Sequence, residues 1–248
     1  MHRLLFAALA VACAWPGSAA QAQSRTRIWD VQLGTPVSQL PLDEWVDPAC
    51  GSNGAPPTLP LEGFADFARC PVERATGLRE VWFIYDDEWE YIARARRALG
   101  VIARYSANTL DRQPIITSLL IDDGGRVQGY RVITDPRAPV DVRKDAYLLI
   151  GLFKGMFGAA PWNCSDQPLG DRERAIEGLF VKQSCEAVAA ERLMLVETRY
   201  LLKAGQDPRD VARFAEEAAG NFESSARLEV YNLAAVTGAP CCQAYARP

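Results

Sequence analysis

The cysteines constrain the fold of this chain more than any other feature of its sequence. The 248 residues contain seven cysteines, of which one, Cys13, lies within the first 22 residues. The other six cysteines are an even number, which is typical of a disulfide framework in an exported protein. This set consists of Cys50, Cys70, Cys164, Cys185, Cys241 and Cys242.

Spacing favours two bridges within this set. Cys50 and Cys70 are about as far apart in the sequence as Cys164 and Cys185. Closing a loop of that length stabilises a protein by about 3 kcal/mol in the chain-entropy model. The two adjacent cysteines near the C-terminus leave three options open, which are a vicinal ring, separate bridges to other cysteines, and a bridge between two chains.

The first 22 residues have the pattern of a secretory signal peptide. Arg3 gives a positive start, a short apolar stretch follows, and the sequence Ala-Gln-Ala at 20–22 fits the small residues before a cleavage site. We therefore predict a signal peptide over 1–22 and an exported domain over 23–248. The domain is expected to be periplasmic or secreted, without a transmembrane segment. Lipid attachment to Cys13 and an uncleaved anchor are the alternatives.

The histidine content limits the chemistry of this chain. Its one histidine, His2, falls within the predicted signal peptide, so Ser-His-Asp catalysis, Cys-His catalysis and histidine-ligated zinc are excluded from the mature domain. The sequence also lacks the glycine-rich phosphate loops and the Gly-x-Ser-x-Gly nucleophile elbow. It therefore favours a protein without its own catalytic centre, and predicts no cofactor and no metal.

The charge balance bears on the partners of the chain. The formal net charge is −4, and loss of Arg3 with the signal peptide makes the mature domain more acidic. Mild acidity argues against nucleic acid as a partner, because nucleic-acid binding requires a basic surface. We expect a protein or glycan partner in the cell envelope.

Hydrophobic periodicity and turn residues predict an α+β fold, with one or more antiparallel sheets of hairpins, three or four packed helices and stabilising disulfides. The clearest hairpin has Asp-Asp-Gly-Gly between two apolar strands, and the longest irregular stretch is 47–60. We predict strands over 27–33, 81–85, 115–121, 126–134, 178–185, 192–202 and 227–233, and helices over 88–99, 142–157 and 207–220.

The two cysteine pairs also raise the question of a duplication. Each pair is followed by a strong strand. One interpretation is therefore a pair of similar halves, at about 23–136 and 137–248. The alternative is a single core without a repeat.

An acidic cluster provides the weak candidates for catalysis. Asp86, Asp87, Glu88 and Glu90 crowd the predicted start of a helix. Acids at a helix N-terminus satisfy free N–H groups and complement the helix dipole, so capping is the favoured interpretation. The alternatives are a Ca²⁺-stabilised structural module and a carboxylate-dependent hydrolase acting on envelope polysaccharide, which needs two carboxyl groups facing one cleft.

Trp162 is the candidate for partner binding. It lies in a Pro-Trp-Asn-Cys loop beside Cys164, and exposed tryptophans are frequent anchors for protein and sugar partners. The favoured hypothesis is an exported, disulfide-braced envelope protein that binds a protein or glycan partner. The expected binding surfaces are the loop with Trp162 and the loop around Cys50.

Overall fold

The fold centres on one long antiparallel sheet. The computed structural model describes residues 26–41, 43–97, 107–207, 209 and 222–245. The strands run in the order β1-β2-β4-β5-β10-β9-β8-β6, with β3 paired to β4 and β7 paired to β9. The strands are β1 Trp45–Cys50, β2 Arg79–Tyr85, β3 Thr109–Leu110, β4 Gln113–Ile121, β5 Val127–Thr134, β6 Asn163–Asp166, β7 Glu173–Arg174, β8 Val181–Ala189, β9 Arg192–Lys203 and β10 Glu223–Asn232.

The sheet is built from two meanders that meet in its middle. Strands β1, β2, β4 and β5 are neighbours in chain order, as are β6, β8, β9 and β10. The meanders join where β5 pairs with β10, with Val132 opposite Leu228. One hydrophobic cluster contains side chains of both meanders, including Phe83 and Val196. The duplication itself stays a prediction, since a shared strand order is no measure of sequence similarity.

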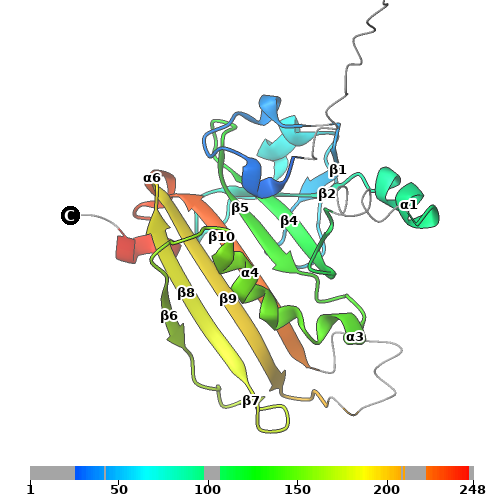
Figure 1. The fold of residues 1–248 in the computed structure, drawn as a ribbon. Coiled ribbons are helices and arrows are strands. Elements are labelled where there is room, and N and C mark those ends of the chain that lie inside the picture. Colours follow the sequence, from blue (N-terminus) through cyan, green and yellow to red (C-terminus); the bar gives the residue numbers. More distant parts are fainter. Residues whose placement is uncertain (1–25, 42, 98–106, 208, 210–221, 246–248) are drawn as a thin grey trace, which may run out of the picture.

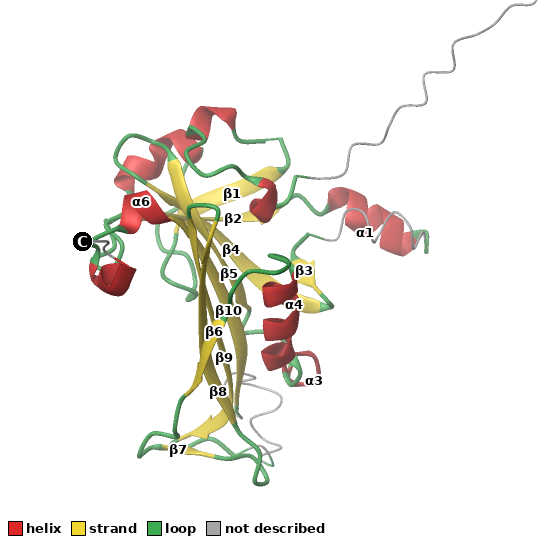
Figure 2. Cartoon of the chain, turned by 60° about the vertical axis from the view of Figure 1, so that its left-hand side comes forward, coloured by secondary structure: helices red, strands yellow, loops and turns green. Residues whose placement is uncertain are grey.

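The helices are shorter than predicted. They comprise α1 Glu88–Ala95, α3 Val140–Arg143, α4 Leu149–Gly155 and α6 Leu233–Val236, with 3₁₀ turns at η1 Ile28–Asp30, η2 Val37–Gln39, η3 Phe64–Arg69, η4 Ala146–Leu148 and η6 Pro240–Tyr245. The antiparallel sheet and the disulfides agree with the prediction, whereas three or four packed helices do not. Figures 1 and 2 show α4 lying across one face of the sheet. The helix predicted over 207–220 falls almost entirely outside the described residues.

The predicted helix over 142–157 is broken into α3, η4 and α4. Side chains of the sheet bind backbone groups at the break. Ser224 Oγ donates to Lys144 O at 3.0 Å and accepts from Tyr147 N at 3.3 Å, and Thr198 Oγ1 donates to Tyr147 O at 2.8 Å. These bonds replace helical ones, which periodicity alone does not reveal.

The predicted strand over 27–33 is wrong, because this segment contains the 3₁₀ turn η1. Asp30 Oδ2 accepts from Arg27 N at 2.9 Å, which closes the turn. Ile28 and Val31 are both buried, and Ile28 N donates to Tyr85 Oη at 2.6 Å. The apolar residues therefore reach the core at a spacing of three, where an alternating strand pattern was expected.

The central hairpin is confirmed. β4 and β5 pair in antiparallel register, with Leu119 opposite Tyr130. In the turn, Gly125 N donates to Asp122 O at 3.0 Å, and Gly125 has a φ of +73° that favours glycine. Asp122 Oδ1 accepts from Arg126 N at 3.0 Å. The strands predicted over 81–85 and 192–202 also form, as β2 and β9.

All six cysteines of the described chain lie in pairs at disulfide distance. The bridges are Cys50–Cys70, Cys164–Cys185 and Cys241–Cys242, with sequence separations of 20, 21 and 1. The first two are the pairs that the spacing favours, and the third is the vicinal ring. Disulfides suggest a compartment other than the reducing cytoplasm. No helix in the described part of the chain is long and apolar enough to cross a membrane.

Candidate functional site

The acidic cluster lies at the start of α1, where the structure uses it for local bonds. Asp86 Oδ1 accepts from Glu88 N at 3.0 Å. Glu90 is 6% exposed and accepts from Arg94 Nε at 2.9 Å, while Asp87 and Glu88 are exposed. The described pockets do not include these acids among their lining residues. The geometry therefore supports an ion pair for Glu90 and a bond from Asp86 to the first helical N–H, while Asp87, the N-cap residue, makes no side-chain capping bond.

The loop around Cys50 is held against the body of the protein. Cys50 N donates to Leu59 O at 2.8 Å, Thr58 N donates to Cys50 O at 3.0 Å and Leu61 N donates to Pro48 O at 2.8 Å. Segment 58–61 thereby covers the outer edge of β1 over residues 48–50. The Cys50–Cys70 bridge is buried beneath it, since both residues are at most 1% exposed.

A buried charge cluster anchors the other side of this loop. Arg131 is 3% exposed, and its guanidinium contacts Glu73, Glu80 and Glu229 at 2.9, 2.9 and 2.7 Å. Glu80 Oε2 also accepts from Asn53 N at 2.6 Å. The cluster thus ties the loop to β2, β5 and β10.

The charges in this cluster stabilise one another against burial. Desolvation alone would lower the pKa of Arg131, but the carboxylates of Glu73, Glu229 and Glu80 outweigh it and raise that pKa. Desolvation likewise opposes ionisation of Glu229, yet Arg227 and Arg131 hold its pKa below the ordinary glutamate value. Glu229 therefore stays ionised, and the cluster works as a structural clamp.

Trp162 is half-buried. Its ring lies 6.2 Å from that of Phe157 in an edge-on arrangement and packs against the main hydrophobic cluster. Its Nε1 is buried and has no hydrogen-bond partner. Trp162 directly precedes β6, which is the edge strand of the sheet.

The outer edge of β6 is open along the whole strand. Its four residues are exposed, and β6 pairs with β8 at one edge while no described strand pairs with the other. Figure 1 shows β6 at the margin of the sheet. An unpaired strand edge offers a row of N–H and C=O groups to another chain.

The register identifies which backbone groups face outward. Asp166 is opposite Gln183, and Gln167 N donates to Lys182 O at 2.7 Å. Bonding alternates along an antiparallel pair, so Ser165 and Asn163 also bond inward to β8. The backbone groups of Cys164 and Asp166 therefore point to the open side.

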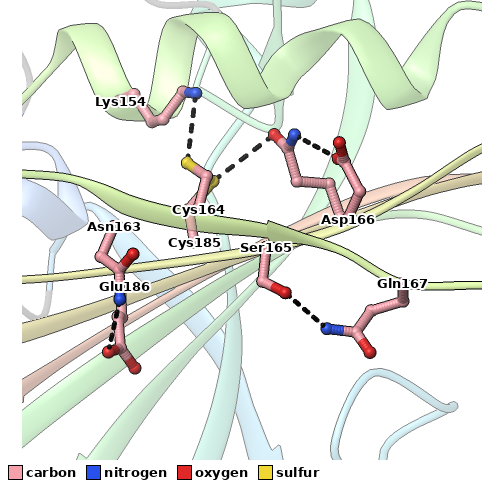
Figure 3. The surroundings of a disulfide bond; sticks show 9 residues. Lys154, Asn163, Cys164, Ser165, Asp166, Gln167, Cys185 and Glu186 are labelled. Atoms are coloured by element: carbon pink, nitrogen blue, oxygen red, sulfur yellow. Dashed lines mark hydrogen bonds between the residues drawn. A yellow bond between two sulfur atoms is a disulfide. The ribbon is translucent and has the colours of Figure 1, made fainter.

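Side-chain bonds and a disulfide hold β6 in place (Figure 3). Cys164 is bonded to Cys185, directly opposite on β8, with the Cα atoms 4.0 Å apart. Gln183 Nε2 donates to Asp166 Oδ1 at 2.7 Å, and Asn163 Nδ2 donates to Glu186 Oε1 at 3.4 Å. A four-residue strand with exposed side chains gains little from hydrophobic burial, so covalent and polar contacts hold it.

A polar hollow lies beside this edge. It has a volume of about 300 Å³ and is lined by Asn163, Ser165, Gln167, Ser184, Cys185, Glu186, Leu195, Val196 and Glu197. Six of the nine lining residues carry hydroxyl, amide or carboxylate groups and three are apolar, so the hollow offers hydrogen-bonding partners beside apolar surface.

Comparisons with family models, with curated proteins and with solved structures find no match for this chain. The case for the β6 edge therefore rests on its geometry. Within the described ranges, no group of three or more Cys, His, Asp or Glu side chains is placed to hold a metal ion.

The sequence analysis did not find this edge. It predicted no strand over 163–166, because Asn-Cys-Ser-Asp has neither the apolar residues nor the alternation of a half-buried strand. Its one usable signal was the predicted Cys164–Cys185 bridge, which places residue 164 beside a predicted strand.

Proposed function

We propose that this chain is an exported protein of the bacterial envelope that works by binding, and that it receives an extended segment of a partner protein along the outer edge of β6. The observation that carries this proposal is the open edge itself, with the backbone groups of Cys164 and Asp166 facing outward. A partner strand would extend the sheet by hydrogen bonds between main chains.

Two further features support this surface over the loop around Cys50. Segment 58–61 bonds to the β1 edge at Pro48 and Cys50, so the backbone groups there are occupied. The polar hollow opens next to β6, where alternate side chains of an added strand would reach it. Trp162 enters the proposal as the residue that positions the start of β6.

The catalytic and Ca²⁺ hypotheses for Asp86 to Glu90 gain no support from this geometry. Glu90 is paired with Arg94 and Asp86 binds the helix backbone. We therefore keep binding as the proposed function, with a protein strand favoured over a glycan because the open groups are those of the backbone.

Two substitutions at one position test the proposal. Asp166→Pro removes an outward-facing N–H without removing a bond to β8, and proline is tolerated on edge strands. Asp166→Ala keeps that N–H but removes the same side chain and its bond to Gln183. The pair thus separates the backbone donor from the side chain.

The experiment is selection of short unconstrained peptides from a displayed library against the wild-type protein, followed by affinity measurement by calorimetry. We expect selected peptides to bind wild type and Asp166→Ala alike, and to lose about tenfold in affinity with Asp166→Pro, as for loss of one or two hydrogen bonds. Circular dichroism checks that both variants fold. Peptides that bind Asp166→Pro equally well, or a selection that yields no binder, would contradict the proposal.

A further inference from the structure

We propose that the Cys164–Cys185 bridge is a thiol–disulfide exchange site, with Cys164 as the reactive sulfur and Lys154 as the group that activates it. Its co-reactant is a dithiol of an exported thiol–disulfide oxidoreductase. This inference goes beyond strand binding and does not depend on it.

Accessibility distinguishes this bridge from the matching one at the other end of the sheet. Cys164 is exposed whereas Cys185 is 3% exposed, so one sulfur of the bridge belongs to a surface residue. In the Cys50–Cys70 bridge the two residues are 0% and 1% exposed. Exchange requires a thiolate to approach one sulfur, so access favours the first bridge.

Lys154 supplies the charge that thiolate chemistry needs. Its Nζ lies 3.7 Å from Cys164 Sγ, and the two groups meet at an exposed position between α4 and β6. A neighbouring ammonium group favours the thiolate over the thiol and lowers the pKa of a cysteine. At the other bridge the Arg79 guanidinium donates to the backbone carbonyl oxygen of Cys70, whereas Lys154 contacts the sulfur of Cys164 itself.

The exchange takes two steps, and each step forms one S–S bond and breaks another. A thiolate of the dithiol attacks Cys164 Sγ, the Cys164–Cys185 bond breaks, and Cys185 leaves with the electron pair and takes a proton from water. The second thiol of the reductant then loses its proton to water and attacks the reductant sulfur that is bonded to Cys164, which releases Cys164 as a thiolate beside Lys154. The dithiol is oxidised and this chain is reduced by two electrons.

Opening the bridge would change the β6 edge. The strand has four exposed residues and few apolar contacts, so the disulfide is the strongest link between β6 and β8. Reduction would leave the backbone pairing with β8 and the two side-chain bonds to Gln183 and Glu186 to hold it. The exchange site therefore couples the redox state of this chain to the order of its open edge.

The first experiment compares the bridges within one native protein. The oxidised chain is incubated with dithiothreitol without denaturant, quenched with iodoacetamide at intervals and digested for mass spectrometry. We expect Cys164–Cys185 to open at least about tenfold faster than Cys50–Cys70, since attack depends on access. Equal rates, or opening of both only on unfolding, would overturn the proposal.

The second experiment isolates the role of Lys154. In the Cys185→Ala variant, Cys164 is a free thiol, and its alkylation rate against pH reports its ionisation. We expect half-maximal rate at a lower pH than for a cysteine peptide, and an upward movement when Lys154→Met is added. The Cys164→Ala variant is the matched control, because its buried Cys185 should alkylate slowly. A pH profile that Lys154→Met leaves unchanged would refute the assignment of Lys154.

Discussion

The two edge strands of the sheet, β1 and β6, differ in how their outer edges and their disulfides are covered. At the β1 end, segment 58–61 covers the strand edge and the Cys50–Cys70 bridge is buried. At the β6 end, the strand is exposed and its bridge includes a surface residue. The two bridges close loops of nearly equal length, so their contributions to chain entropy are similar. The ends differ in burial, so the strand edge and the disulfide are accessible to another molecule only at the β6 end.

The packing behind each edge explains this contrast. Trp45 on β1 stacks on Phe83 at 4.4 Å and meets Tyr85 edge-on at 6.0 Å. Strand β6 contributes no side chain to the buried core of the described chain. The β1 end is therefore stabilised by apolar burial, whereas the β6 end depends on one covalent bond and a few polar contacts.

Tryptophan truncation should show the largest difference between the ends. Trp45 is 2% exposed, so Trp45→Ala is expected to cost about 4 kcal/mol by leaving a cavity. Trp162 is half-buried, so Trp162→Ala is expected to cost about 1 kcal/mol. Urea denaturation followed by circular dichroism measures both. Similar costs for the two variants would remove the contrast in burial.

Loss of the buried arginine should come next in size. Arg131→Met removes the arginine that pairs with the buried carboxylate of Glu80 and leaves Glu229 with Arg227 alone, which we expect to cost about 3 kcal/mol. Arg199→Met is the control, since Arg199 lies 3.6 Å from Glu197 on the open face with both side chains exposed, and should change stability by less than about 0.5 kcal/mol. The same urea titrations measure the free energy of unfolding of both variants. A loss of stability for Arg131→Met as small as that of the control would contradict the structural role of the charge cluster.

Acidification should have a smaller effect, carried by the same cluster. Although burial opposes its ionisation, Arg227 and Arg131 lower the pKa of Glu229. The unfolded chain therefore takes up a proton at higher pH than the folded one, and stability falls as pH drops through the ordinary glutamate range towards the folded pKa. In urea titrations at falling pH, Glu229→Gln should lack this part of the loss. A variant that loses as much stability as wild type would show that other groups are responsible.

The sequence predicted the features that are local in the chain. The β4–β5 hairpin followed from apolar runs around Asp122 to Gly125, and β2 and β9 followed from their apolar patterns. The helix over 142–157 was wrong in its continuity, because Ser224 and Thr198 bind its backbone from strands far along the chain. The strand over 27–33 was wrong because Ile28 and Val31 are buried from a turn.

The candidate site also has a part that the sequence predicted and a part that it did not. Cysteine spacing by itself favoured the pairs Cys50–Cys70 and Cys164–Cys185, because loop closure depends on separation along the chain. Only the tertiary structure decided that Cys164 stands on an open edge beside Lys154 while Cys50 lies under a covered one. Whether a strand has a second neighbour depends on segments distant in sequence, and an exposed polar strand carries no hydrophobic pattern to reveal it.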